Sequence, residues 1–223
     1  GLPANTIEGI CLGQDGLLWF TTDAGLVRFD GERFRTYTTA DGLISNRLRG
    51  IARDTDGNLW IGSQGGGVAC FDGNTFKTYT TDDGLLTNNT ASVCIDVHGK
   101  VWIGSSCALS CLENGKLTHY TREDGLIITE TGIGNLLADR QGRIWCATEC
   151  GLCCFENGHF IPYTRQHGLA GNRIGPLAED RAGRIWIGTW GSGLSCLENG
   201  RFTTFTSEDG LLSNGISHIM QDH

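Results

Sequence analysis

A ten-residue pattern recurs along this chain at intervals of about 42 residues, a period typical of solenoids, arrays and propellers. It reads YTTADGLISN at 37–46, YTTDDGLLTN at 79–88 and FTSEDGLLSN at 205–214. Alignment on the shared DGL divides the chain into repeats 1–41, 42–83, 84–124, 125–167 and 168–209, with a partial sixth repeat at 210–223. A chain built this way must bury its apolar surface between neighbouring repeats.

Each repeat contains four short segments with strand character. In the second repeat these are LRGIARD (48–54), LWIGS (59–63), VACFD (68–72) and TFKTYT (75–80). The Asp-Gly and Asn-Gly pairs between segments favour hairpins, because both central residues of a type I′ turn need positive φ. No segment carries a sustained helical period. A four-stranded antiparallel unit with one recurring Trp is typical of a blade, so the predicted fold is an all-β propeller.

The DGLxxN segment is predicted to connect the outermost strand of one blade to the innermost strand of the next. Its glycine lets the chain reverse, its leucine fills the space between blades, and its asparagine bonds the backbone. The glycines are Gly42, Gly84, Gly125, Gly168 and Gly210, and the asparagines are Asn5, Asn46, Asn88, Asn172 and Asn214. The fourth crossover departs from the pattern, because it reads GLIITETGIG with two extra residues.

The strand count predicts five complete blades plus one extra inner strand, which leaves ring closure open. The chain is an excerpt of a ring of six to eight blades, or it closes as a five-bladed ring in which ISHIMQD (216–222) competes with TIEGICL (6–12). In the third arrangement the open end strands pair between chains, because an unpaired apolar strand is prone to association. Self-association through the end strands is therefore one expected interaction.

Composition excludes several partners. The formal net charge is −8 and no stripe of Lys or Arg stands out, which argues against nucleic acid and anionic membrane surfaces. No apolar run approaches the ~20 residues of a membrane span, so no direct membrane insertion is expected. The first ten residues lack the basic and apolar regions of a signal peptide.

The repeat consensus carries a family resemblance. N-x-[IL]-x-x-[IL]-x-x-D-x-x-G-x-[LI]-W-I-G-[ST], followed by GL-x-x-F-[DE]-x-G-x-F-x-x-[YF]-T-x-x-DGL, resembles the two-component regulator propeller repeat over the whole chain. The resemblance implies an extracytoplasmic, periplasmic sensor propeller that binds a small molecule or oligosaccharide. In that family the propeller usually precedes a membrane helix and a histidine kinase or hybrid regulator.

A weaker similarity links ICLGQDGLLWFTT (10–22) to streptogramin-lyase-like propellers, which need a His, Glu and metal cluster. His218 is the one histidine expected on an inner strand, and Glu130 is not placed near it. No catalytic residue, metal site or cofactor is therefore predicted. A recurring aspartate is interpreted as a turn lock rather than a metal ligand; it stands at Asp54, Asp96, Asp139, Asp180 and Asp222.

The ten cysteines are interpreted mainly as small packing residues. Seven occupy slots of the repeat: Cys11, Cys70, Cys94, Cys111, Cys146, Cys154 and Cys196. The others leave two disulfides open, Cys107–Cys150 between adjacent blades and Cys146–Cys153 across a hairpin. Many unpaired thiols are typical of a reducing compartment. The family resemblance implies the opposite, so a cytoplasmic location also stays open.

A ligand is expected where the crossovers and the loops between second and third strands meet around the central channel, because such loops vary without harming the blades. These loops supply Asp23, Gln64, Glu149 and Trp190. Trp190 is the one Trp outside the blade pattern, and an exposed aromatic stacks on sugar faces. Packing against the next loop is the alternative.

Three arginines complete the predicted site. Arg47, Arg49 and Arg173 lie where inner strands begin. A guanidinium near a channel mouth binds carboxylate or sulfate, although an arginine at a strand start is also commonly only solvated.

Three classes of function are compatible with this fold. A non-enzymatic sensor of an oligosaccharide or other small molecule is favoured. A structural or protein-interaction scaffold is the alternative, and a lyase-type enzyme is the least favoured, because no cluster of carboxylate and histidine is found.

Overall fold

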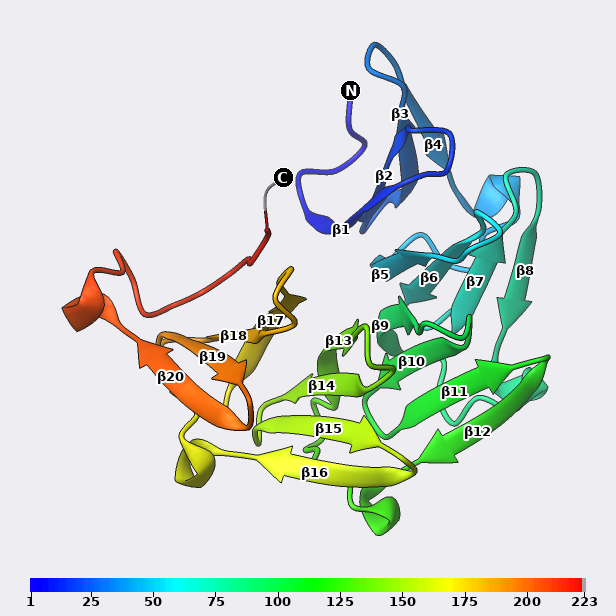
Figure 1. Ribbon diagram of the computed structural model, residues 1–223. Helices are drawn as coiled ribbons and strands as arrows, with labels where there is room; N and C mark the ends of the chain where they lie inside the picture. The colour runs from blue at the N-terminus through cyan, green and yellow to red at the C-terminus, as the bar shows by residue number, and fades with distance from the viewer. Residues whose placement is uncertain (222–223) are drawn as a thin grey trace.

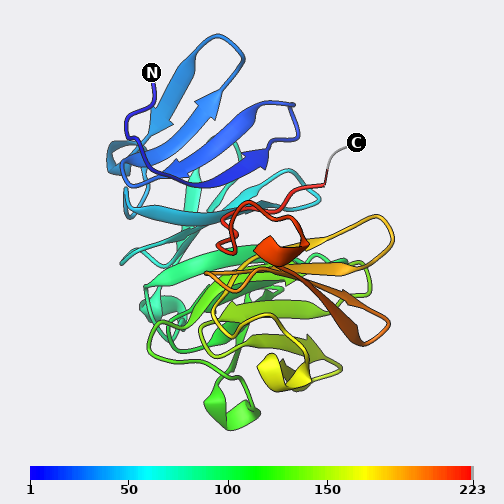
Figure 2. The ribbon, with the colours of Figure 1, turned by 90° about the vertical axis from the view of Figure 1, so that its left-hand side faces the viewer.

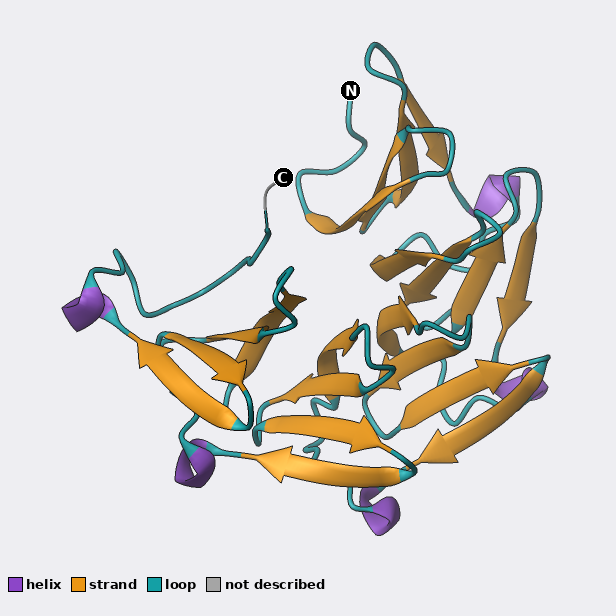
Figure 3. Ribbon diagram, in the orientation of Figure 1, coloured by secondary structure: helices purple, strands orange, loops and turns teal. Residues whose placement is uncertain are grey.

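The structure, a computed structural model, describes residues 1–221 and contains five four-stranded antiparallel sheets in succession along an open arc (Figure 1). Strands follow chain order in every sheet, with the first strand innermost and the fourth outermost. Strands and short 3-10 turns make up all regular structure between residues 1 and 221 (Figure 3). The prediction of an all-β fold of five four-stranded blades is confirmed. None of the described helices is long or apolar enough to cross a membrane.

The strands are short, with four to six residues each. The first sheet contains β1 (Ile7–Leu12), β2 (Leu18–Thr22), β3 (Gly25–Phe29) and β4 (Phe34–Tyr37). The second contains β5 (Leu48–Arg53), β6 (Leu59–Ser63), β7 (Val68–Phe71) and β8 (Phe76–Tyr79). The third contains β9 (Thr90–Ile95), β10 (Val101–Ser105), β11 (Leu109–Glu113) and β12 (Lys116–Tyr120). The fourth contains β13 (Ile133–Ala138), β14 (Ile144–Thr148), β15 (Leu152–Glu156) and β16 (His159–Tyr163). The fifth contains β17 (Ile174–Glu179), β18 (Ile185–Thr189), β19 (Leu194–Glu198) and β20 (Arg201–Phe205).

The crossovers confirm the predicted roles of the DGLxxN residues. In the first, Gly42 has φ 104°, Leu43 is buried, and Asn46 Oδ1 accepts a hydrogen bond from the Thr39 amide at 2.8 Å. Asn88, Asn172 and Asn214 make the equivalent contact. Each crossover also forms a 3-10 turn closed by a capping box, which the sequence analysis did not anticipate. These turns are η1 (Thr39–Asp41), η2 (Thr81–Asp83), η3 (Arg122–Asp124), η4 (Arg165–His167) and η5 (Ser207–Asp209).

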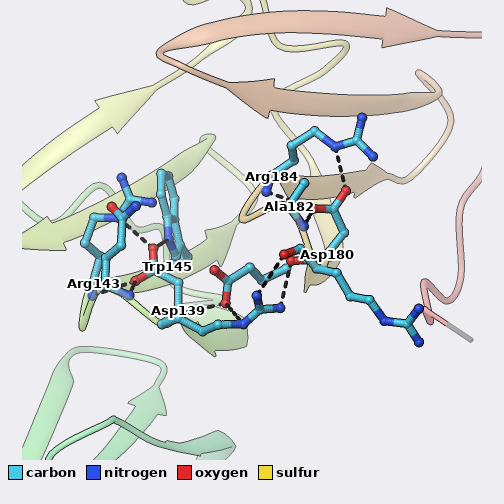
Figure 4. A network of polar contacts seen from close by, with 10 residues as sticks. Asp139, Arg143, Trp145, Asp180, Ala182 and Arg184 are labelled. Carbon is cyan, nitrogen blue, oxygen red and sulfur yellow. Dashed lines mark hydrogen bonds and ion pairs between the residues drawn. The ribbon is translucent and has the colours of Figure 1, made fainter. Parts of the chain in front are cut away.

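The recurring aspartate locks the turn between the first two strands, as predicted. Asp180 Oδ1 accepts from the amides of Ala182 and Arg184 (Figure 4). Its Oδ2 accepts from Trp186 Nε1 at 2.9 Å. Asp54, Asp96 and Asp139 repeat the contact with Trp. Asp222 lies outside the described residues. The carboxylate thus fixes the turn and the orientation of the buried indole together.

Four separate apolar cores lie between adjacent sheets. Each of the five blade tryptophans stacks on an aromatic side chain of its own outer strand, as Trp19 does on Tyr37 at 5.7 Å. The same Trp meets the next sheet, where the Trp19 and Phe71 ring centroids are 5.6 Å apart. The crossover leucine between the two sheets, Leu43, belongs to the same core. Burial between sheets, rather than within any one of them, therefore holds the arc together.

The extra inner strand predicted for residues 216–222 is not formed in the described part of this segment. Gly215 makes one isolated bridge with Trp190, and the Ile216 amide donates to the Thr189 carbonyl at 3.0 Å. After that, residues 217–221 run as an irregular tail toward the first sheet (Figures 1 and 2). A single strand without the other three strands of its blade gains too few ladder bonds to become regular.

Neither of the two disulfides that the sequence left open is formed, because all ten cysteines are free. Cys146 and Cys153 do face each other across β14 and β15. They instead pack in the core between the third and fourth sheets, with Cys94 and Cys111. Burial raises the pKa of the Cys146 thiol well above its ordinary value, so these side chains behave as small hydrophobes.

Candidate functional site

A cavity of about 440 Å³ opens at the centre of the arc, where the inner strands of the first four sheets begin. Its wall combines inner-strand residues with residues of two loops and two crossovers, as predicted for this end of the blades. The lining residues are Glu8, Arg49, Gly50, Gln64, Asn89, Thr90, Ala91, Ser92, Ser106, Thr131, Gly134 and Asn135.

Each inner strand has a β-bulge where it borders the channel. The register of pairing with the second strand shifts between Ile7 and Gly9, and again between Ile133 and Asn135. The other three inner strands shift at equivalent places. A bulge inserts one unpaired residue, bends the strand and re-aims side chains. Because Glu8 and Gly134 are the inserted residues in their strands, the bulges bring these positions into the cavity wall.

The fourth crossover shapes one side of the wall. Its two extra residues lengthen the chain before β13, and Thr131 reaches the cavity as a result. Thr129 Oγ1 and Thr131 Oγ1 are hydrogen-bonded at 2.7 Å. Gly132 has φ 72°, and a Cβ there would collide with the backbone of Ser105 and Ser106. The irregular crossover thus rests directly on the loop that carries Ser106.

The charges in the wall are paired. Arg49 Nη1 lies 2.9 Å from Glu8 Oε1, and Arg49 Nη2 donates to Gln64 Oε1 at 3.4 Å. Glu8 and Arg49 are the charged side chains in the lining, so their opposite charges leave the wall with no net charge. Within the described wall the remaining functional groups are amides and hydroxyls. Ser92 Oγ is buried without a hydrogen-bond partner, which is unusual for a native hydroxyl.

The structure brings two of the seven predicted site residues, Arg49 and Gln64, into the wall. Arg47 is exposed beside it, and its carbonyl accepts from the Gln64 amide at 2.8 Å. Asp23 is exposed in the β2–β3 turn and does not line the cavity. The seven predicted residues therefore do not lie in one cluster.

The other three predicted residues form a separate group at the start of β17. Arg173 Nη2 lies 3.2 Å from Glu149 Oε1, so a second predicted anion-binding arginine already faces a carboxylate. The Trp190 amide donates to the Arg173 carbonyl at 3.0 Å, and 57% of the Trp190 residue is exposed. Its indole lies over Gly175, where a Cβ would stand 3.2 Å from Trp190 Nε1. Asn135 Nδ2 donates to the Gly175 carbonyl at 3.4 Å, which links this group to the cavity wall.

Sequence reasoning missed most of the polar wall. Glu8, Asn89, Thr131 and Asn135 were not selected, because the bulges that place them cannot be recognised from alternation of apolar residues. One signal was available, since Glu8 and Arg49 occupy the same position in consecutive repeats. Opposite charges at one position of adjacent repeats become neighbours when the repeats pack side by side.

The histidines take structural roles where their contacts are defined. His119 bridges Ser110 Oγ and the Gly84 carbonyl. His167 replaces the usual capping aspartate, so its Nδ1 accepts from the Thr164 amide. Among residues 1–221, no three His, Cys, Asp or Glu side chains gather closely enough to hold a metal ion.

Two segments, residues 42–65 and 168–191, match the family model described as "Two component regulator propeller". Both run from a crossover through the first two strands of a blade and into the following loop. The resemblance found in the sequence is thus confirmed for these two repeats. No curated protein matches the chain.

Several solved structures share this fold. The extracellular domain of BT3049 from B. thetaiotaomicron, assigned to a hybrid two component system, superposes with a TM-score of 0.64 at 22% identity over 100% of this chain and 37% of that one. The extracellular domain of BT4673 from the same organism is also assigned to a hybrid two component system. It superposes with a TM-score of 0.75 at 20% identity, over 91% of this chain and 31% of that one. Virginiamycin B lyase from Staphylococcus aureus superposes with a TM-score of 0.74 at 13% identity, over 92% of this chain and 71% of that one. The chain thus spans about a third of the sensor domains it matches, and the likeness shows a propeller fold.

Proposed function

From repeats of the two component regulator propeller type around a polar central cavity, we propose that this chain is a non-enzymatic ligand-binding propeller. It would form the sensing part of an extracytoplasmic two-component system. The observation that carries the proposal is the cavity wall itself. Amide and hydroxyl groups from three sheets and two crossovers converge on one space, while its Arg49 and Glu8 charges neutralise each other. Such convergence favours binding of a small polar molecule over a purely structural role.

The chemistry of the wall favours an uncharged oligosaccharide. Asn89, Asn135 and Gln64 offer both donors and acceptors, which suit the hydroxyl groups of a sugar. Two of the three predicted anion-binding arginines already face carboxylates, which weakens the case for an acidic ligand. Trp190 supplies an exposed aromatic face beside the wall, on which a further sugar ring could stack.

A thermal-shift screen against neutral and uronic-acid oligosaccharides tests the proposal. A ligand at ~100 times its dissociation constant adds ~2.7 kcal/mol to the free energy of unfolding, which is visible as a rise in Tm. We expect a rise with a neutral oligosaccharide, and we expect Asn89→Ala and Trp190→Ala to reduce it. Asn74→Ala is the matched control, because Asn74 is an exposed amide in the β7–β8 turn at the opposite end of the blade.

The outcomes separate the candidate functions. A shift that persists in Asn89→Ala and Trp190→Ala would place the ligand elsewhere on the molecule. A shift only with uronic-acid sugars would reassign the site to an anion. No shift with either class would favour the scaffold alternative.

A further inference from the structure

A second hollow adjoins the central cavity on the side of the irregular crossover, residues 125–132. Its volume is about 530 Å³ and that of the cavity is about 440 Å³, so each has the size of a small-molecule site. Ser106, in the β10–β11 loop, lines both spaces. Thr131 lines the cavity, whereas Thr129 and Glu130 line the hollow. The two spaces therefore meet where the crossover rests on the β10–β11 loop.

The irregular crossover lacks the asparagine that the regular crossovers carry. In a regular crossover the asparagine folds over the 3-10 turn, as Asn46 does when its Oδ1 accepts from the Thr39 amide at 2.8 Å. No asparagine stands between residues 125 and 132. The two extra residues instead carry the chain onto the β10–β11 loop, where Gly132 lies against the backbone of Ser106. The space beside η3 therefore stays open and forms part of the hollow.

The charged side chains of the hollow suit a ligand rich in hydroxyl groups. Arg122, Glu123 and Glu130 are exposed, and within residues 1–221 none of their charged groups has an ion pair or a hydrogen bond. Arg49 and Arg173, by contrast, face carboxylates. Carboxylates accept hydrogen bonds from sugar hydroxyls and a guanidinium donates to them, and such bonds are stronger than those between neutral groups. Two carboxylates against one guanidinium also disfavour an acidic sugar in this hollow.

We propose that the ligand is a neutral oligosaccharide longer than a disaccharide, which continues from the central cavity across Ser106 into the hollow beside η3. The first sugar units occupy the cavity, and a later unit bonds Arg122 and Glu130 through its hydroxyl groups. This inference rests on the proposed function, and it adds the length of the ligand and the direction in which the ligand runs. The irregular crossover is then the element that selects for a longer chain.

Calorimetric titration with the disaccharide and the hexasaccharide of the neutral malto-, xylo- and manno-series tests the length of the ligand. In the series that binds, the hexasaccharide should bind about tenfold more tightly or better, the strength of one hydrogen bond to a charged group. Glu130→Ala should remove most of this difference. Glu32→Ala is the matched control, because Glu32 is an exposed carboxylate in the β3–β4 turn, at the opposite end of the blade. Circular dichroism confirms that both variants are folded.

Alkylation of Cys107 tests the direction of the ligand independently. Its thiol is exposed, and the residue lines the hollow but not the cavity. Bound hexasaccharide should slow its alkylation, whereas bound disaccharide should leave the rate unchanged. Cys150 is the internal reference, because this half-buried residue of the β14–β15 loop lines neither space.

The outcomes distinguish failure of this inference from failure of the proposed function. Equal affinity for both lengths, or unchanged alkylation of Cys107 in the hexasaccharide complex, would overturn the inference and leave the cavity as the binding site. A length difference that Trp190→Ala removes and Glu130→Ala retains would also overturn it, because the ligand would then run toward β17. Binding of no sugar in any series would overturn the proposed function and this inference with it.

Discussion

Arg49 and Glu8 stand at the same position of two consecutive repeats, and their side chains meet at 2.9 Å in the wall of the central cavity. Their side chains are 39% and 28% exposed. Solvent therefore screens the attraction, and such pairs contribute at most about 1 kcal/mol to stability. The main effect of the pair is to hold Arg49 beside Gln64 and to leave the wall without net charge.

Breaking this pair is expected to have a small effect on folding. Arg49→Gln should lower the free energy of unfolding by less than about 1 kcal/mol, and adding salt should shrink the difference. Urea denaturation at low and high salt measures both effects. Arg47→Gln is the control, since Arg47 is exposed outside the wall. A loss of several kcal/mol would mean that the pair is a structural tie between the first two sheets.

Truncation of a blade tryptophan should lower the free energy of unfolding much more than truncation of the loop tryptophan. Trp145 is fully buried and bonded to Asp139, so Trp145→Ala should cost about 3–5 kcal/mol. Trp190→Ala removes a largely exposed side chain and should change stability by well under 1 kcal/mol. Denaturant midpoints of the two variants measure the contrast. Equal losses would contradict the assignment of Trp190 to the loop surface.

Acid should weaken the turn that Asp180 locks. Burial raises the pKa of this carboxyl, but hydrogen bonds from Trp186 and Arg184 outweigh it and lower the pKa from 3.8 to about 2. A group with a lowered folded pKa stabilises the fold above its unfolded pKa, and this contribution disappears as the pH falls toward the folded value. The Tm should therefore fall between about pH 4 and about pH 2, and less steeply in Asp180→Asn.

The matched control is Asp56→Asn, because Asp56 is an exposed carboxylate in the equivalent turn of the second sheet. Its Tm profile should follow that of the unmodified chain. Identical slopes for Asp180→Asn and the unmodified chain would show that the Asp180 carboxylate adds nothing to stability above its pKa.

In the native protein, the rate at which each thiol reacts with an alkylating reagent should depend on its burial. Cys107 is exposed in the β10–β11 turn and should react first. Burial raises the pKa of Cys154 to about 12 and that of Cys146 well above its ordinary value, so both should react only after unfolding. Mass spectrometry of the labelled peptides identifies the order. Early labelling of Cys146 would contradict a packed core between the third and fourth sheets.

The blades could be predicted well from the sequence, because the turns and side-chain contacts that shape each blade are local. The DGL turn, the Asn-Gly hairpins and the Asp–Trp lock each lie within a few residues of one another. Asn114, for example, has φ 51° just before Gly115, as the hairpin prediction requires.

The site was less predictable, because it depends on contacts between repeats. Asn135 reaches the wall through a bulge and through an irregular crossover, and neither leaves an apolar pattern. The ion pairs of the arginines were not anticipated, for a related reason. The carboxylate facing Arg49 is 41 residues earlier in the chain, and the one facing Arg173 is 24 residues earlier.

The open arc also determines how strongly the sheets depend on one another. Stability in a repeat array is a sum of units and nearest-neighbour interfaces, and each end sheet has one such interface where each internal sheet has two. A monomer should therefore fray from its ends, with amide hydrogens of the first and fifth sheets exchanging before those of the third.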